Sequence, residues 1–136
     1  MTPERTAIIA RLEAATGPDR ELDTDIWLMV EPEATRKISH YVHIASGTPQ
    51  TLDETRRGDG RLITVPNFTG SLDAAMTLVP EGYWWGLHML GSKDGGFSAA
   101  VLPEDTHMEW HRGATAHLAL CIAALEARWS NERNAT

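Results

Sequence analysis

Residues 115–129, TAHLALCIAALEARW, decide the fold of this chain. The hydroxyl of Thr115 can cap the first free amides of a helix, and the residues that follow are apolar on nearly every side. The stripe at helical spacing consists of Leu118, Cys121, Ile122, Leu125 and Trp129. A helix of this kind must be surrounded by protein, so we expect it at the centre of the molecule, packed against a sheet.

The segments before this helix predict the strands of that sheet. Residues 83–90, YWWGLHML, and 97–104, FSAAVLPE, flank the glycine-rich turn SKDGG and predict a β-hairpin. A further strand is expected within 107–113, HMEWHRG. Ser71 caps a short helix over 71–79, SLDAAMTLV, which precedes the hairpin.

The beginning of the chain predicts two helices. Thr2 followed by Pro3 is typical of a helix start, and Gly17-Pro18 ends the helix that follows. Asp19 is the expected cap of a second helix. Because the break between the two helices is short, we expect an antiparallel helical hairpin.

The middle of the chain is more polar. The β-branched and aromatic residues of 37–45, KISHYVHIA, predict a strand. Residues 46–60, SGTPQTLDETRRGDG, predict a long loop that ends in a turn at Asp59-Gly60. Residues 61–68, RLITVPNF, predict the next strand.

These elements predict an α+β fold in one domain over residues 1–136. We expect a mainly antiparallel sheet of three to five strands, packed with an N-terminal helical hairpin, a short middle helix and a long C-terminal helix. The hydrophobic fraction of 42% suffices for a core without disulfides or a structural metal.

Charge and composition exclude several classes of function. The chain has 19 acidic and 12 basic residues, a net charge of −7 and no basic cluster, so we expect no direct binding to nucleic acid. The longest apolar run, Leu118–Leu125, is far shorter than the roughly 20 residues of a membrane span. The opening MTPERTAIIA lacks the layout of a secretory signal. Cys121 has no second cysteine to pair with, so we expect a buried, inert thiol in a cytoplasmic protein.

Six acidic residues and one basic residue, Arg20, lie between Asp19 and Glu33. Such a stretch is typical of a solvated helix face. The alternative is a surface that docks onto a basic groove. Glu21 and Asp25, which lie one helical turn apart, are the candidate binding residues of that surface.

Six histidines raise the question of a metal site. His107, Glu109 and His111 share one face of a strand, but the outer pair would lie about 13 Å apart, too far for one zinc ion. The metalloprotease pattern requires glutamate directly after the first histidine, where this chain has Met108. The remaining candidates are expected to be packing residues: His40, His43 and His117. No nucleophile elbow, phosphate-binding glycine loop or paired-cysteine motif occurs, so we predict no catalytic residues, metal or cofactor.

The strand at 83–90 is the best candidate for a binding surface. Alternation puts Trp84, Gly86 and His88 on one face, where the glycine leaves a notch between larger side chains. Together with Trp110 from the next segment, Trp84 and His88 can form an aromatic platform for a base or for a partner's side chain. The alternative is that helices cover both faces of the sheet.

Two stretches carry a resemblance to a known family. They are 68–87, FTGSLDAAMTLVPEGYWWGL, and 114–129, ATAHLALCIAALEARW, preceded by ATGPDRELDTDI at 15–26. This layout resembles small proteins of phages and prophages, particularly of proteobacteria, whose domain is described as a phage α-β-α sandwich. The resemblance runs from about Ile8 to Trp129 and is weakest in the middle, and family members often carry proline at position 116 or 117. The shared residues are caps, turns and core positions, so the resemblance implies fold and origin and no catalytic residues.

Three hypotheses of function follow. The first is a phage-encoded accessory protein that binds a host protein or nucleoprotein complex stoichiometrically, as an inhibitor of a host defence component such as a CRISPR-type nuclease complex. The second is a small-ligand module, including a nucleotide sponge, that uses Trp84, His88 and Trp110. The third is a small hydrolase that uses the histidines around position 107. Self-association is left open by the sequence.

Overall fold

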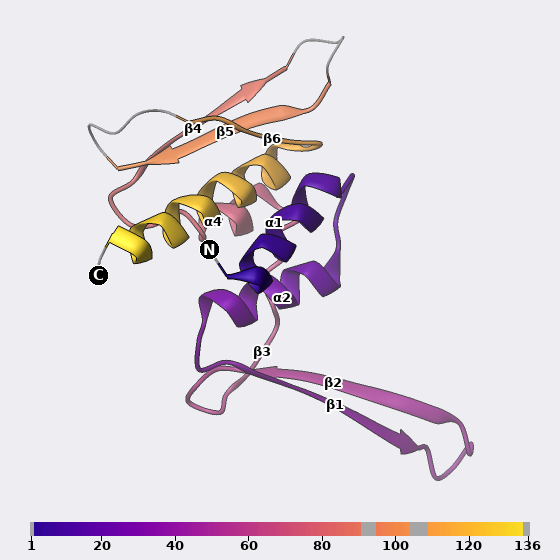
Figure 1. The fold of residues 1–136 in the computed structure, drawn as a ribbon. Coiled ribbons are helices and arrows are strands. Elements are labelled where there is room, and N and C mark those ends of the chain that lie inside the picture. Colours follow the sequence, from indigo (N-terminus) through magenta and orange to yellow (C-terminus); the bar gives the residue numbers. More distant parts are fainter. Residues whose placement is uncertain (1, 91–94, 104–108, 135–136) are drawn as a thin grey trace. The chain divides into compact units, whose positions relative to one another are not determined.

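The computed structural model describes residues 2–90, 95–103 and 109–134. The helices are α1 (Pro3–Ala14), α2 (Arg20–Val30), α3 (Leu72–Met76) and α4 (Ala116–Asn134). The strands are β1 (Thr35–Val42), β2 (Pro49–Arg56), β3 (Leu62–Ile63), β4 (Trp84–Met89), β5 (Phe97–Leu102) and β6 (His111–Gly113) (Figure 1). The predicted α+β class is confirmed. The strands form two antiparallel sheets of three, in place of one sheet of three to five strands.

The chain divides into two compact units. Unit 1 consists of the residues up to Asp23 and those from Asn67 onward, and unit 2 is Thr24–Pro66. Each unit contains one sheet: β4-β5-β6 belongs to unit 1, and β1-β2-β3 belongs to unit 2. The expectation of a single domain over residues 1–136 stays a prediction.

The sheet of unit 1 carries α4 on one face (Figure 1). β5 is the central strand, and its pairs include Ala100 with Gly86 of β4 and Phe97 with Gly113 of β6. Gly113 marks the face that meets the helix, because a Cβ atom there would lie 2.5 Å from the backbone nitrogen of Ala119. Glycine at this position therefore permits the close approach of strand and helix.

α4 forms the centre of unit 1, as its sequence predicts. The whole predicted stripe is buried: Leu118, Cys121, Ile122, Leu125 and Trp129. The hydroxyl of Thr115 accepts a hydrogen bond from the backbone nitrogen of Leu118 at 3.2 Å, which confirms the predicted cap. α1 packs against α4 through Ile8, Ile9 and Leu12. Among the described helices, none combines the length and apolar character that crossing a lipid bilayer requires.

A buried polar cluster ties the start of α2 to the loop before α3. Oδ1 of Asp23 accepts hydrogen bonds from the backbone nitrogen and from the hydroxyl of Thr69, each at 2.8 Å. Oδ2 of Asp23 accepts from Arg20 at 2.9 Å. The hydroxyl of Thr69 accepts from the backbone nitrogen of Asp19 at 2.8 Å, and Asp19 also caps α2 through the backbone nitrogen of Leu22. The acceptors of Asp23 are thus satisfied inside the protein, as burial of a carboxylate requires.

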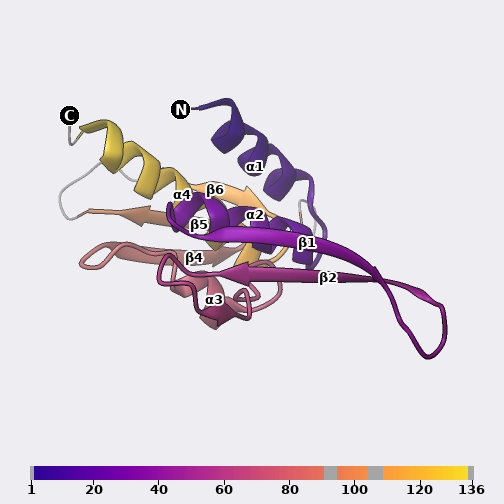
Figure 2. The ribbon, with the colours of Figure 1, turned by 90° about the horizontal axis from the view of Figure 1, so that it is seen from below.

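Unit 2 contains a long antiparallel hairpin of β1 and β2, called the arm here (residues 35–56) (Figure 2). The pairs run from Thr35–Arg56 to Val42–Pro49. β3 adds only two pairs at the base of the arm, next to Thr55 and Arg56. The two strands therefore continue to the turn without a third strand beside them.

The arm corrects two sequence-based expectations. Residues 46–60 were expected to form one loop, whereas 49–56 form β2. Polar residues form this strand because the backbone pairs with β1 along its whole length and because Arg36 donates two hydrogen bonds to Asp53, at 3.0 and 2.7 Å. The strand expected over 61–68 shrinks to Leu62–Ile63. The strand predicted over 37–45 is confirmed as β1.

Candidate functional site

Trp84, His88 and Trp110 lie together on the sheet of unit 1. Gly113 faces α4, and alternation through the paired strands then puts Gly86 on the opposite face. Trp84 and His88 share that face with Gly86, because they are two residues away from it on β4. The helices of unit 1 lie on the other side of the sheet (Figure 1).

The two indole rings converge over Gly86. A Cβ atom on Gly86 would lie 3.5 Å from Cη2 of Trp84 and 3.6 Å from Cη2 of Trp110. The ring of His88 meets Trp110 edge-on, with centroids 6.3 Å apart and planes at 64°. The exposed fractions are 52% for Trp84 and 45% for Trp110. The aromatic platform is thus a surface of unit 1 that solvent reaches.

The floor of the platform consists of small residues of β5. Ala100 is fully buried and Ser98 nearly so, although no helix of unit 1 lies on their face. Ala100 pairs with Gly86, the residue over which the rings meet, so the indoles lie next to this part of the floor. The notch expected at Gly86 therefore holds the protein's own tryptophans.

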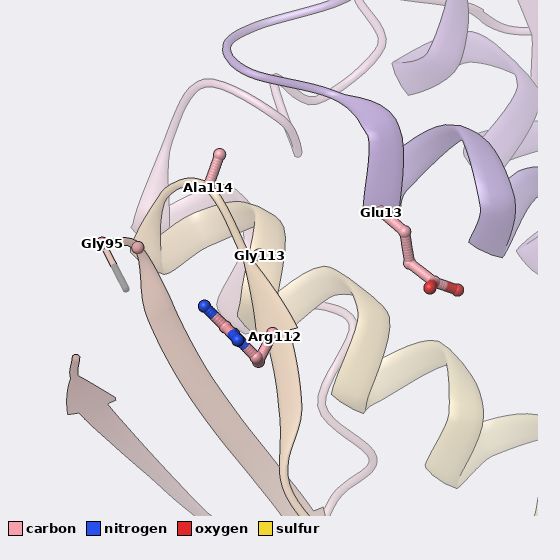
Figure 3. Close-up of a pocket in the computed structure, with 6 residues that line it drawn as sticks. Glu13, Gly95, Arg112, Gly113 and Ala114 are labelled. Carbon is pink, nitrogen blue, oxygen red and sulfur yellow. The ribbon is translucent and has the colours of Figure 1, made fainter. Parts of the chain in front are cut away.

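A pocket of about 380 Å³ includes Arg112, which lies on the same face of the sheet as the platform. Its lining residues are Glu13, Gly95, Gly96, Arg112, Gly113 and Ala114. Figure 3 shows the side chain of Arg112 directed toward Gly95, and the carboxylate of Glu13 directed away from both. Arg112 pairs with Ser98, which pairs with His88, so a cation stands in the same row across the sheet as the platform histidine.

The arm provides a second exposed surface. Every residue from His40 to Asp53 is exposed. The segment 38–52, called the arm tip here, contains no Asp, Glu, Lys or Arg, in a chain that is 23% charged. Its exposed large apolar residues are Ile38, Tyr41, Val42, Ile44 and Leu52. The arm tip is therefore uncharged, exposes several large apolar side chains and is open to solvent.

Ion pairs stiffen the base of the arm. Arg36 pairs with Asp53, and Arg56 pairs with Glu54 at 2.8 Å. The hydrogen bonds from Arg36 lower the pKa of Asp53 from its ordinary value of 3.8. Nearer the tip, the hydroxyl of Tyr41 donates to the side-chain oxygen of Gln50 at 2.6 Å. The Arg36–Asp53 and Tyr41–Gln50 bonds join the two strands, whereas Arg56 and Glu54 both lie on β2.

The acidic stretch has several different roles. Glu21 is exposed and Asp25 is half-buried, but Asp23 between them belongs to the core of unit 1. Asp19 caps α2. The stretch is therefore neither a uniform solvated face nor a uniform docking surface, and the docking role of Glu21 and Asp25 stays a prediction.

The histidines that the structure describes do not gather at one site. His111 pairs with Ala99 and so faces the α4 side of the sheet, opposite to the platform. His107 lies outside the described residues. His40 and His43 lie on the arm, next to Thr51 and Ser46 respectively. Within residues 2–90, 95–103 and 109–134, no three His, Cys, Asp or Glu side chains gather as metal ligands would.

The thiol of Cys121 is buried, as the sequence predicts. Its sulfur donates to the backbone carbonyl of Phe68 at 3.3 Å. Burial, with a smaller contribution from the negative charge of Asp23, raises the pKa of Cys121 from 9.0 to about 12. A thiol in this state is no nucleophile at neutral pH.

No known protein family, curated protein or solved structure matches this chain.

Two features of these surfaces escaped the sequence analysis. The arm tip was missed because its second strand, PQTLDETR, begins with proline and lacks the valine, isoleucine and aromatic residues that predict a strand. Arg112 was missed although a signal existed. It follows Trp110 by two residues, which on a strand puts both side chains on one face.

Proposed function

We propose that this protein acts by stoichiometric binding to another protein, and that the arm tip is the part that the partner covers. The observation that carries this proposal is the uncharged, exposed segment 38–52. The proposed place of action is the cytoplasm of a bacterial host cell.

The first support is energetic. A two-stranded ribbon has no core of its own and is marginal in water without a third strand or a packed face. The arm nevertheless exposes Ile38 and Val42 on one face and Tyr41 and Leu52 on the other. Covering these side chains recovers about 25 cal/mol for each Å² of apolar surface removed from water. A partner that encloses the tip therefore stabilises the arm as well as the complex.

The second support is the pattern of charge. The centres of protein interfaces are depleted in charged residues and enriched in aromatic ones, while their rims are polar. The arm repeats this arrangement along its length, with an uncharged tip and two ion pairs at its base. The partner's surface is thus expected to be apolar where it meets the tip.

The third support is a free strand edge. β1 is the outer strand of its sheet, so its outward backbone groups have no strand partner. Such an edge can add to an exposed strand of another protein, with the side chains providing specificity. Toward the tip the outer edge of β2 is also without a strand partner among the described residues, so the arm offers two faces and two edges for recognition.

The resemblance to phage proteins selects the first partners to test. Phage accessory proteins commonly neutralise host defence by binding, so a defence component such as a CRISPR-type nuclease complex is our proposed partner. Binding alone suffices for such inhibition, and the mechanism needs no catalytic residue.

The test compares three tagged proteins as baits for purified defence complexes and for host lysate. The wild type is compared with the triple variant Ile38→Thr, Val42→Thr, Leu52→Thr, since threonine keeps the strand preference and removes apolar surface. Trp84→Ala, on the other sheet, is the matched control. We expect wild type and control to retain the same protein in a 1:1 ratio and the arm variant to lose it.

Two results contradict the proposal. One is equal retention of the partner by the arm variant. The other is a wild-type dimer in light scattering that the arm variant converts to a monomer, because the tip is then covered by a second copy of this chain.

A further inference from the structure

The aromatic platform and Arg112 support an inference that is independent of the arm. These residues belong to unit 1, and they combine flat aromatic surface with a cation on the same face of the sheet. We propose that this face binds a free nucleotide, with the base stacked on Trp84 and Trp110 and the phosphate held by Arg112.

The two tryptophans provide the stacking surface. Their six-membered rings meet over Gly86, and each side chain keeps about half of its surface exposed. The floor of Ala100 and Gly86 lets both rings lie low on the sheet, because neither residue has a side chain that would lift them. A planar base can cover such a surface, and stacking on an aromatic side chain works for any base, since every base has a π-face.

His88 closes one side of the platform. Its ring stands edge-on to Trp110, at 64° to the indole plane. A ring in this orientation presents nitrogen atoms beside a stacked ligand, where they can exchange hydrogen bonds with the edge of a base or with a ribose hydroxyl.

Arg112 provides the charge. It follows Trp110 by two residues, so alternation puts both side chains on the same face of the sheet. The guanidinium offers donors in a planar fork that suits phosphate oxygens. Gly95 and Gly96, which have no side chains, line the same pocket as Arg112.

The charge balance favours a single nucleotide over a nucleic acid. The chain carries a net charge of −7, which repels a polyanion. One arginine in register with the platform suits one phosphate group. The same arginine separates this ligand class from neutral sugars, which also stack on exposed tryptophans but gain nothing from a cation.

The test is calorimetric titration of the full chain with AMP, GMP, adenosine and a dT oligonucleotide. We expect AMP or GMP to bind once per chain. Trp84→Ala and Trp110→Ala should each weaken that binding about tenfold or more. Trp85→Ala is the matched control, because Trp85 is the next residue of β4, is 41% exposed and lies on the opposite face. Its binding should equal that of the wild type.

Arg112→Gln tests the phosphate. This variant should lower the affinity for AMP and leave the affinity for adenosine unchanged, so that the two ligands bind with equal affinity. Trp84→Tyr and Trp110→Tyr keep a stacking ring and should retain most of the affinity, which guards against an alanine variant that fails to fold.

The proposal is wrong if neither AMP nor GMP binds at millimolar concentration, or if the oligonucleotide binds more tightly than either nucleotide. It is also wrong if Trp85→Ala loses as much nucleotide affinity as Trp84→Ala, or if Arg112→Gln weakens adenosine and AMP equally. If the arm proves to bind no partner, the nucleotide titration is still valid, because it uses other variants and other ligands than the test of the arm.

Discussion

Replacing Asp23 tests the buried polar cluster of unit 1. In the wild type, its carboxylate accepts two hydrogen bonds from Thr69 and one from Arg20. Asp23→Ala removes both acceptor oxygens and with them all three hydrogen bonds. The hydroxyl of Thr69 can turn to the carbonyl of Asp19 at 3.2 Å, and Arg20, whose side chain is 55% exposed, can turn to water. The backbone N–H of Thr69, which is buried, keeps no acceptor.

The expected loss of unfolding free energy follows from these lost hydrogen bonds. A buried, unsatisfied N–H costs about 1–3 kcal/mol, and the lost charge-assisted bonds and packing add to it. Breaking a buried ion pair by removing one partner costs about 3–5 kcal/mol in general, and we expect Asp23→Ala in that range. Asp23→Asn keeps the shape and an oxygen for Thr69 but loses the charge that Arg20 meets. We expect it to cost about 1–2 kcal/mol.

Urea unfolding followed by circular dichroism gives these free energies by linear extrapolation. Thr69→Val completes a double-mutant cycle with Asp23→Asn, and a coupling of about 1 kcal/mol is expected. Glu21→Ala, exposed on the same helix, is the control and should stay within about 0.5 kcal/mol of wild type. The reasoning fails if Asp23→Ala costs no more than this control, or if Asp23→Asn is as damaging as Asp23→Ala.

The remaining predictions concern α4, Cys121 and the arm. Leu118→Ala and Ile122→Ala should each destabilise the protein by about 2–5 kcal/mol in the same urea assay, and unchanged stability in both would place α4 outside the core. The pKa of Cys121 is raised to about 12 in the folded protein, so the thiol of the unfolded chain ionises at lower pH than that of the folded chain. The free energy of unfolding should therefore fall as the pH rises above 9, and it should fall less in Cys121→Ala. Rapid labelling of the native thiol by a disulfide reagent at neutral pH would contradict its burial. The pKa of Asp53 is lowered by Arg36, so the arm should gain from this pair above the ordinary pKa and lose it on acidification. NMR titration should show the pKa of Asp53 returning toward 3.8 in Arg36→Gln, and an unaltered value would refute the pairing.

The helices of unit 1 could be predicted from the sequence because their signals are local. Thr2 caps α1, Ser71 caps α3 and Thr115 caps α4, each through a hydroxyl three residues before the amide that it accepts from. The central position of α4 follows from its composition alone, since a helix with apolar residues on every side has no stable place in water.

The platform could be predicted in part for a similar reason. Strand alternation puts Trp84 and His88 on one face whatever the sheet looks like. The addition of Trp110 depends on its reaching across β5 to Gly86, which the sequence suggests but cannot fix. That the two indoles fill the glycine notch themselves is a result of this non-local packing.

The division into two sheets could not be predicted, because strand pairing is non-local. β2 is a strand through its register with β1, although its own residues favour a loop. The burial of Asp23 is equally non-local. Its partner Thr69 lies 46 positions further along the chain, so the local pattern shows only one more carboxylate in an acidic stretch.

Asp23 and Thr69 also stand close to the two points where the chain leaves unit 1 and returns to it. Their hydrogen bonds hold together the two points of unit 1 between which residues 24–66 are inserted. Unit 2 is therefore a long insertion whose two ends are joined within unit 1. The entropy of closing a loop grows only with the logarithm of its length, so the insertion can lengthen, shorten or be exchanged at small cost to the closure. Changes in the length of the β1–β2 hairpin are therefore expected to leave the fold of unit 1 intact.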